Sequence, residues 1–295
     1  MNKLIIVRKE EIENYKINES RDSKFPFLSA ELEDENLMIK EMLKNKKLLT
    51  DEEFGFYFAG LIEGDGSVSS RGIEIVFHLN DISLAYYLKN KIGFGNIYKI
   101  KNEKAVKYSV FNYEGVKKIL FLVNGKFYSY YKIEYLKKHN YEKKYNIKIL
   151  PPLDYIKNPL NNNHFLSGFA DSDGNFSIFI TKSKTHKTKK NVQLVFRISQ
   201  KDSTILNIII KTFGGNISTW KNGLNDINCY NSTSFKIFPK IIKYFDKYNL
   251  LSTKFINYIK WKKATNIILK KEHLTIEGLK KFKEIKDKMN NNLFK

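Results

Sequence analysis

Two aspartates end two similar segments of the chain, and their type and spacing suit them to do chemistry. Phe58-Ala-Gly-Leu-Ile-Glu-Gly-Asp-Gly66 recurs as Leu166-Ser-Gly-Phe-Ala-Asp-Ser-Asp-Gly174, so Asp65 and Asp173 hold the same place in both copies. Each segment is apolar with small residues, which predicts helices over 54–64 and 163–172. The aspartates then lie at helix C-termini, where the helix dipole disfavours a negative charge by about 0.3–1 kcal/mol.

Small residues recur four positions apart on one face of each predicted helix: Gly60 and Gly64, then Gly168 and Ser172. Tight helix packing alone would explain them, but it leaves the two acids unexplained. If the helices pack side by side, the two carboxylates meet and repel each other unless a cation lies between them. Carboxylate, carbonyl and water oxygens suit Mg²⁺. Metal ions there would activate water and stabilise the leaving oxygen of a phosphodiester.

The charge of the chain points to the same class of partner. Its 52 Lys+Arg against 31 Asp+Glu give a formal charge of +21, which favours a polyanion. The surplus lies in the repeats, because residues 1–53 are slightly acidic. A hydrophobic content of 42% supports a folded core, and the single cysteine excludes a disulfide framework or a cysteine-built zinc site. No apolar run approaches the roughly 18 residues of a membrane helix, so no membrane partner is expected.

Further landmarks follow the acids in the same order and indicate a tandem duplication. Val76-Phe-His-Leu79 is matched by Val195-Phe-Arg-Ile198, and Gly95-Asn-Ile97 by Gly215-Asn-Ile217. Ser129-Tyr-Tyr-Lys132 is matched by Ser252-Thr-Lys254. On this alignment the second copy is 14 residues longer between acid and lysine, and 11 of the 14 fall in a basic hairpin tip, Thr181 to Lys190.

Periodicity predicts an α+β fold of two αββαββα repeats, each with a four-stranded antiparallel sheet. After each first helix, strands are expected at 67–71 and 72–79 and at 175–181 and 191–199, followed by helices at 83–92 and 203–213. The expected domains are an N-terminal extension, 1–45, a first repeat, 46–144, a linker, 145–162, and a second repeat, 163–295.

These motifs resemble the LAGLIDADG homing endonucleases of the single-chain kind with two motif copies, over roughly 51–292. The resemblance implies a DNA-binding saddle, with the motif helices at the interface between the repeats. It implies that the last acid of each motif, Asp65 and Asp173, is catalytic and binds Mg²⁺, with Mn²⁺ or Ca²⁺ able to replace it in binding. The backbone carbonyls of Gly64 and Ser172 would share the metals. Glu63 and Asp171 would serve structure.

The resemblance also implies polar residues around the acids. Gln200 matches the family glutamine that positions water. Its counterpart in the first copy is Asp81 if the strand is aligned without a gap, or Asn80 otherwise. Lys132 and Lys254 match the family's pocket lysine, a stabiliser of charge on the phosphate.

Alternate residues of a strand share a face, so the residues facing DNA should run by twos. Arg71 and Arg197 are the best candidates for reading guanine, because bidentate contact needs a guanidinium. Lys182 and Lys184 at the hairpin tip are expected to hold phosphates. The expected face comprises Ser69, Arg71, Glu74, Val76, His78, Tyr98 and Lys107, then Ser177, Phe179, Thr181, Lys182, Lys184, Gln193, Val195, Arg197, Ser218 and Trp220.

The expected function is therefore site-specific, Mg²⁺-dependent cleavage of both strands of a long double-stranded DNA target. The resemblance implies 3′ overhangs, a monomer and promotion of the host intron's mobility. The alternatives are an RNA maturase assisting splicing of its host intron and a DNA-binding relative without activity; retention of Asp65 and Asp173 favours cleavage. Abundant Lys, Asn, Ile, Tyr and Phe indicate an AT-rich gene, which with no visible import signal favours synthesis inside an organelle, expected to be a mitochondrion. An AT-rich bacterial or phage genome would give the same residue usage.

Overall fold

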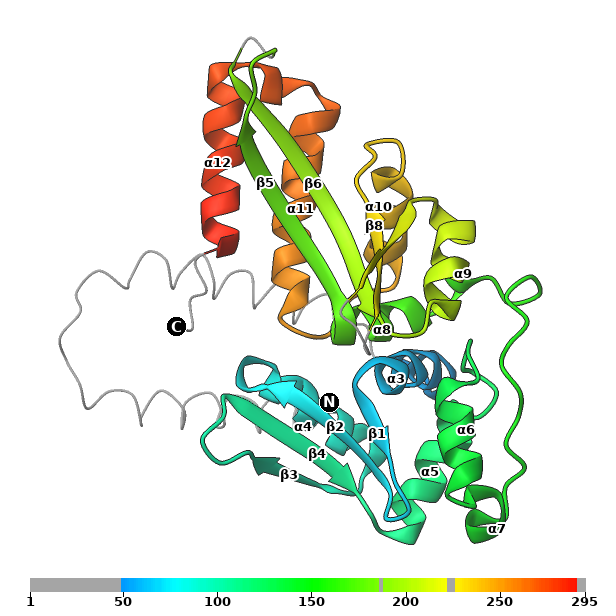
Figure 1. The fold of residues 1–295 in the computed structure, drawn as a ribbon. Helices are drawn as coiled ribbons and strands as arrows, with labels where there is room; N and C mark the ends of the chain where they lie inside the picture. The colour runs from blue at the N-terminus through cyan, green and yellow to red at the C-terminus, as the bar shows by residue number, and fades with distance from the viewer. Residues whose placement is uncertain (1–48, 186–187, 222–225, 291–295) are drawn as a thin grey trace, which may run out of the picture. The chain divides into compact units, whose positions relative to one another are not determined.

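The computed structural model describes residues 49–185, 188–221 and 226–290. The expected N-terminal extension, 1–45, lies outside the described residues. The rest contains two copies of one arrangement, each built around a helix that ends at one of the two aspartates (Figure 1). The first copy begins with α3 (Asp51–Asp65) and the second with α8 (Phe165–Asp173).

Each first helix is followed by a sheet of the same topology. The first sheet has the order β1-β2-β4-β3 and the second β5-β6-β8-β7, with all neighbours antiparallel. The strands are β1 (Gly66–Val68), β2 (Ile73–His78), β3 (Asn96–Lys99) and β4 (Ala105–Val110), then β5 (Gly174–Lys182), β6 (Lys190–Gln200), β7 (Asn216–Trp220) and β8 (Ile227–Ser232). The predicted pair of four-stranded antiparallel sheets is confirmed.

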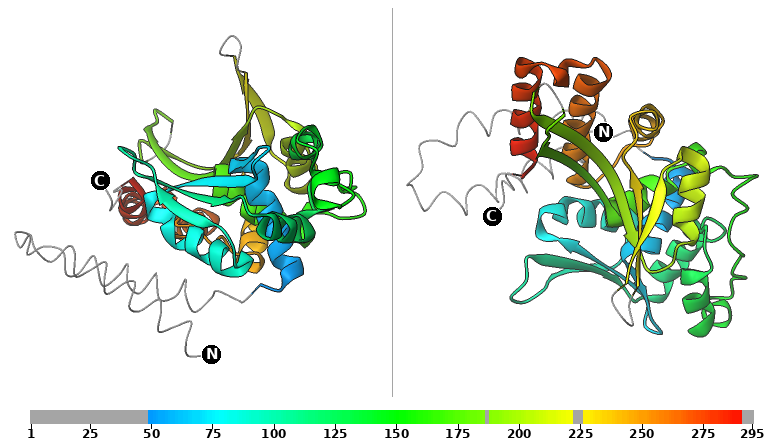
Figure 2. Two further views of the ribbon diagram at one scale, coloured as in Figure 1. Left: turned by 90° about the horizontal axis from the view of Figure 1, so that it is seen from below. Right: turned by 45° about the horizontal axis from the view of Figure 1, so that its top comes forward.

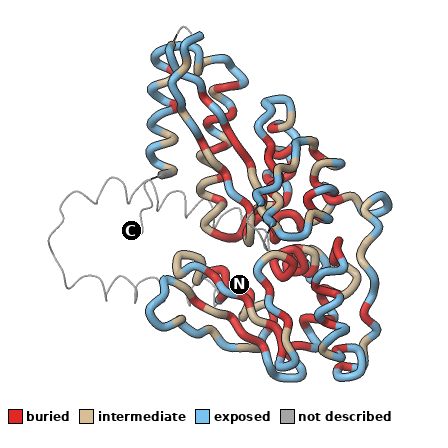
Figure 3. The backbone as a smooth tube through the Cα atoms, in the orientation of Figure 1, coloured by how far each residue is buried: buried red, intermediate tan, exposed pale blue. Residues whose placement is uncertain are grey.

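Helices cover one face of each sheet and leave the other open, which gives the expected saddle. Burial alternates along β2, because Ile73, Ile75 and Phe77 are buried while Val76 and His78 are exposed. Figure 3 shows the buried and exposed stretches of the backbone. The covering helices of the first copy are α4 (Ile82–Ile92), α5 (Tyr113–Val123), α6 (Tyr131–Lys138) and α7 (Tyr141–Tyr145). Those of the second are α9 (Thr204–Phe213), α10 (Phe238–Lys247), α11 (Lys254–Leu269) and α12 (Ile276–Asn290).

The predicted αββαββα order is thus correct through the second strand pair, after which each copy has more than one helix. In the second copy the last two, α11 and α12, pack against β5 (Figure 2). Phe176 and Phe196 stack across the β5–β6 pair with ring centroids 4.8 Å apart. Trp261 of α11 lies 5.6 Å from Phe176, so the long hairpin rests on an aromatic core.

The strand register corrects the alignment of the two copies. Gly66 pairs with Ile75, whereas Gly174 pairs with Ile198, so the hairpin spans 10 residues in the first copy and 25 in the second. The second hairpin is therefore 15 residues longer than the first, whereas matching the two Val-Phe pairs predicted a difference of 11. The match of Val76-Phe77 with Val195-Phe196 is therefore four residues out of register. Equivalent positions in a sheet are defined by the residues that pair across the strands, not by local similarity.

Candidate active site

The two helices that carry the acids pack directly against each other. A Cβ added at Gly60 would lie 2.0 Å from the Phe165 carbonyl oxygen, and one at Gly168 would lie 1.8 Å from that of Tyr57. Only glycine permits this backbone approach, which explains the small residues of both motifs. The close approach continues to the helix ends, where a Cβ at Gly64 would lie 2.5 Å from Asp173 Oδ2.

Asp65 and Asp173 therefore lie together at the C-terminal ends of α3 and α8. Burial raises the pKa of both carboxyl groups above the usual value, and that of Asp173 reaches about 6. The negative charge of Asp65 is the next cause of the high pKa of Asp173. Two like charges in a partly desolvated place are stabilised by a cation between them.

The two lysines that match each other in sequence both lie beside the acids, each held by a backbone carbonyl group at the end of its own motif. Lys132 Nζ donates to the Gly66 carbonyl oxygen at 2.6 Å, and Lys254 Nζ donates to that of Ser172 at 2.5 Å. Their positive charges oppose the rise in the pKa of both aspartates. Lys132 is buried, and burial lowers the pKa of its ammonium group. The structure thus brings both predicted lysines to the two acids.

The residues expected to position water differ between the two copies. Gln200 Nε2 donates to Asp173 Oδ2 at 2.6 Å, so the glutamine lies at the acid of its own copy. Ile75 and Ile198 hold equivalent register positions, because each pairs with the glycine that follows its acid. Gln200 lies two residues after Ile198 and Phe77 two residues after Ile75, so Phe77 is the first-copy equivalent of Gln200. The alignment of Asp81 or Asn80 with Gln200 is therefore wrong. Asp81 Oδ1 instead accepts from the Thr253 backbone N–H at 2.7 Å, across the repeat boundary.

Sequence reasoning missed the hydrogen bonds that place the lysine-bearing segments. Asp171 accepts from the Leu251 backbone N–H at 2.7 Å, from Ser252 Oγ at 2.5 Å and from Tyr57 Oη at 2.8 Å. In the first copy, Glu63 accepts from Ser129 Oγ at 2.5 Å. The signal was present, because each serine stands two or three residues before its lysine in both copies.

The donor set fits a hard divalent cation. Among the residues that the structure describes, no group of three or more His, Cys, Asp or Glu could hold a metal ion. A metal here would therefore take the two carboxylates with backbone carbonyl and water oxygens, as Mg²⁺ and Ca²⁺ do. The expected carbonyl ligand of Ser172 is already fixed by Lys254 but keeps a second lone pair. A divalent cation bound here would offset the burial and mutual repulsion that raise the pKa values of both acids.

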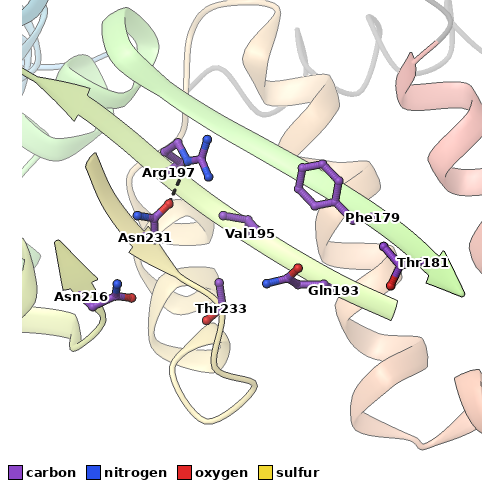
Figure 4. A pocket seen from close by; sticks show the side chains of 8 residues that line it. All are labelled: Phe179, Thr181, Gln193, Val195, Arg197, Asn216, Asn231 and Thr233. Carbon is purple, nitrogen blue, oxygen red and sulfur yellow. Dashed lines mark hydrogen bonds between the residues drawn. The ribbon is translucent and has the colours of Figure 1, made fainter. Parts of the chain in front are cut away.

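The open face of the second sheet carries a depression of about 480 Å³ (Figure 4). Five of its lining residues belong to the expected DNA-facing set: Phe179, Thr181, Gln193, Val195 and Arg197. Three more were missed: Asn216, Asn231 and Thr233. Asn231 Oδ1 accepts from Arg197 Nε at 2.8 Å, and the Arg197 guanidinium lies 5.9 Å from the Trp220 ring centroid.

The other expected residues of the second copy surround this depression or lie near the hairpin tip. Ser218 Oγ accepts from Asn231 Nδ2 at 3.1 Å, and the Ser177 hydroxyl donates to Asn175. Lys182, the last residue of β5, and Lys184, in the turn beyond it, are both exposed.

The open face of the first sheet matches expectation only within its strands. Glu74 accepts from Ser109 Oγ at 2.8 Å and pairs with Lys107 Nζ at 2.8 Å. Val76, His78 and Tyr98 are exposed on the strands. Ser69 and Arg71, expected on a strand over 67–71, lie instead in the turn after β1, which ends at Val68. The Arg71 guanidinium lies 5.2 Å from the Phe111 ring centroid.

Comparison with known proteins gives consistent matches. A family model of the LAGLIDADG endonucleases matches residues 166–265. An uncharacterized 37.2 kDa protein of cox1 intron 2 from Schizosaccharomyces pombe is 40% identical, over 82% of this chain and 74% of its own. The intron-encoded DNA endonuclease aI3 of Saccharomyces cerevisiae is 29% identical, over 77% of this chain and 68% of its own.

A solved structure of I-SmaMI, bound to an uncleaved DNA target in the presence of calcium ions, has a TM-score of 0.60 at 25% identity. It covers 80% of this chain and 98% of its own. No helix in the described part of the chain is long and apolar enough to cross a membrane. The doubled motif, the paired sheets and the 40% identical relative together show that this chain belongs to the LAGLIDADG endonuclease family.

Proposed function

We propose that this protein is a site-specific DNA endonuclease that makes Mg²⁺-dependent double-strand breaks with 3′ overhangs. The observation that carries the proposal is the placement of Asp65 and Asp173 together at the ends of two packed helices, with raised pKa values. A fold gains no stability from burying two carboxylates side by side, so their recurrence in both repeats indicates a functional cation site.

The remainder of the surface suits double-stranded DNA. A charge of +21, carried mostly by lysine, favours contacts with phosphates that carry no sequence information. Sequence would be read from the open sheet faces, where a two-stranded β-ribbon fits the major groove. Arg197 is held in place by Asn231 on such a face, and its guanidinium suits the O6 and N7 edge of guanine.

The residues at the acids would have separate roles in metal binding and in positioning water. Asp65 and Asp173, with the carbonyl oxygens of Gly64 and Ser172, would hold Mg²⁺, which supplies an activated water and stabilises the leaving oxygen. Gln200 keeps the carboxylate of Asp173 oriented through its 2.6 Å hydrogen bond and would help to position water.

The two lysines would stabilise charge on the phosphate. An ammonium group has three protons, and a backbone carbonyl oxygen anchors Lys132 and Lys254. Each lysine can therefore keep its anchor and still donate to a phosphate oxygen.

Asp81 would take a different role from the one that the alignment suggested. Its carboxylate accepts from the Thr253 backbone N–H, the residue just before Lys254 at the start of α11. An acceptor at this position satisfies one of the free N–H groups at a helix start. Asp81 would therefore position the lysine of the opposite repeat rather than orient water in its own.

Both acids belong to one chain, so the proposed active form is a monomer. The S. pombe relative is named for an intron of cox1, and the S. cerevisiae relative is named as intron-encoded. With the AT-rich residue usage, these names support a mitochondrial intron as the source and mobility of that intron as the consequence of cleavage.

Selection from a randomised double-stranded DNA pool tests the proposal. Fragments cut in the presence of Mg²⁺ are recovered by end ligation and sequenced. We expect one shared sequence, 3′ overhangs at the cut, and no product in chelator or with the Asp65→Asn/Asp173→Asn variant. Cutting at unrelated sequences, or undiminished cutting in chelator, would contradict the proposal. Binding of intron RNA with no DNA cleavage would favour the maturase alternative instead.

A further inference from the structure

The two hairpins that follow the acids differ greatly in length (Figure 1). In the first repeat the β1–β2 pairing ends at Val68 with Ile73, and a turn closes it. The equivalent pair in the second repeat is Phe176 with Phe196, and the pairing runs on to Lys182 with Lys190. Six further residue pairs, from Ser177–Val195 to Lys182–Lys190, thus exist only in the second repeat. This segment is the hairpin extension.

The hairpin extension has two distinct faces. Ile178, Val192 and Leu194 are buried toward the helices. Phe179, Thr181 and Gln193 are exposed and line the open depression of the sheet (Figure 4). The extension therefore continues the DNA-facing surface away from the acids instead of folding back on the molecule.

Two long helices support the extension from behind. Both α11, 16 residues long, and α12 pack against β5, and Phe282 of α12 is fully buried. The matching helix of the first repeat, α6, has only eight residues. There the short hairpin tip is held by α7, because Tyr141 Oη donates to the Ser69 carbonyl oxygen at 2.8 Å and Lys144 Nζ to that of Ser70 at 2.9 Å.

We infer that the two repeats bind unequal halves of the DNA target, and that the hairpin extension reads bases beyond the reach of the first repeat. This inference rests on the proposed function. Six residue pairs rise about 20 Å at roughly 3.3 Å each, and successive base pairs are about 3.4 Å apart. The half bound by the second repeat is therefore longer by about six base pairs.

The side chains of the extension specify which bases it prefers. The Gln193 amide can pair with the N6 and N7 edge of adenine, and the Thr181 methyl group and the Phe179 ring suit the thymine methyl group. Arg197, closer to the acids, suits guanine. The outer part of the long half is therefore A·T-rich. In the first repeat, Arg71 is an exposed residue of the turn that closes the short hairpin.

Binding selection tests the inference separately from cleavage. The full chain is incubated with randomised double-stranded DNA in Ca²⁺, bound DNA is recovered and sequenced, and the same site is then tested for cutting in Mg²⁺. The cut marks the centre of the site, or, without cutting, a footprint of the bound complex does. We expect sequence preference to extend about six base pairs further on one side, with A·T pairs outermost. Equal halves would overturn the inference.

Two exposed substitutions assign the halves to the repeats. Gln193→Ala should lower the preference by about 5- to 150-fold, the size of a good bidentate contact, at an outer position of the long half only. Val76→Ala on the first sheet is the matched control and should act only in the short half. Loss of preference in the short half with Gln193→Ala would overturn the assignment. An unequal site that is bound but never cut would refute the cleavage proposal and leave this inference standing.

Discussion

The two repeats share a framework but surround their acids differently. Tyr108 Oη donates to the Phe94 carbonyl oxygen, and Tyr230 Oη makes the same bond to Gly214, in sheets of identical strand order. A lysine of each copy lies beside the acids, but Gln200 donates to Asp173 whereas the first-copy residue at the register position of Gln200 is Phe77. The glycines that bring the acids together and the lysines beside them recur in both copies, whereas the side chain at the register position of Gln200 differs.

The inner acids show the same contrast. Asp171 is hydrogen bonded by a tyrosine, a serine and a backbone N–H, and burial still raises its pKa to about 6. Glu63 accepts from Ser129, while its buried Oε2 has no hydrogen-bond partner among the residues that the structure describes, and burial raises its pKa to about 7. The first repeat therefore has the less stabilised buried carboxylate, and each difference between the repeats gives a way to test the comparison.

The glycines at the helix crossing should give the largest effect, and it should be equal in the two repeats. Gly60→Ala and Gly168→Ala each push a methyl group to within about 2 Å of a backbone oxygen of the other helix. We expect each to lower the free energy of unfolding by about 3 kcal/mol or more, measured by urea denaturation. Phe121→Ala on the exposed face of α5 is the control, expected within about 0.5 kcal/mol of wild type. A mild effect of either glycine variant would break the proposed symmetry of the interface.

The two lysines come next and should reveal whether both halves use them. Lys132→Met and Lys254→Met should each lower the cleavage rate about 10²–10³-fold, the cost of losing a donor to developing charge. Rates on the selected DNA site measure this, with exposed Lys137→Met and Lys263→Met as matched controls. If only one lysine matters, the repeats contribute unequally to phosphate stabilisation.

The burial of the Glu63 carboxyl group predicts a pH effect on stability. Its folded-state pKa of about 7 lies above the usual 4.5, so the native state binds more protons between those values and loses stability as pH rises through them. Glu63→Gln carries no charge and lacks this loss. Relative to that of wild type, the free energy of unfolding of the variant should rise by about 2–3 kcal/mol between pH 4.5 and 7 and stay level above pH 7.

Urea midpoints at pH 5, 6, 7 and 8 measure the difference, with exposed Glu134→Gln on α6 as the control. Parallel curves for wild type and Glu63→Gln would show that the first repeat tolerates this carboxylate without cost.

Asp81 should give the smallest effect and one that crosses the repeats. Asp81→Ala removes the acceptor at the Thr253 N–H and should cost about 1 kcal/mol of stability, as helix caps do. Because α11 carries Lys254, cleavage should fall as well, while Asp81→Asn keeps an acceptor and most of both properties. If Asp81→Asn were as inactive as Asp81→Ala, the carboxylate would have a catalytic role in its own repeat.

Much of the framework followed from the sequence because it depends on local pattern. Alternation placed Glu74, Val76 and His78 on the open face, and glycine spacing predicted the packed helices. The register did not follow, because a match of Val76-Phe77 with Val195-Phe196 ignores which residues pair across the hairpin. The same slip led to the wrong alignment of Asp81. Contacts between distant segments, such as Tyr57 with Asp171, have no local signature in the sequence.

The central claim is that two acids from two divergent repeats form one double-strand cutting site. It is tested most directly with Asp65→Asn and Asp173→Asn on a supercoiled plasmid carrying the selected site, with Mg²⁺, following linear product and DNA binding together. We predict no linear product from either variant, with affinity in Ca²⁺ within about threefold of wild type. Full linearisation by either variant would contradict the account.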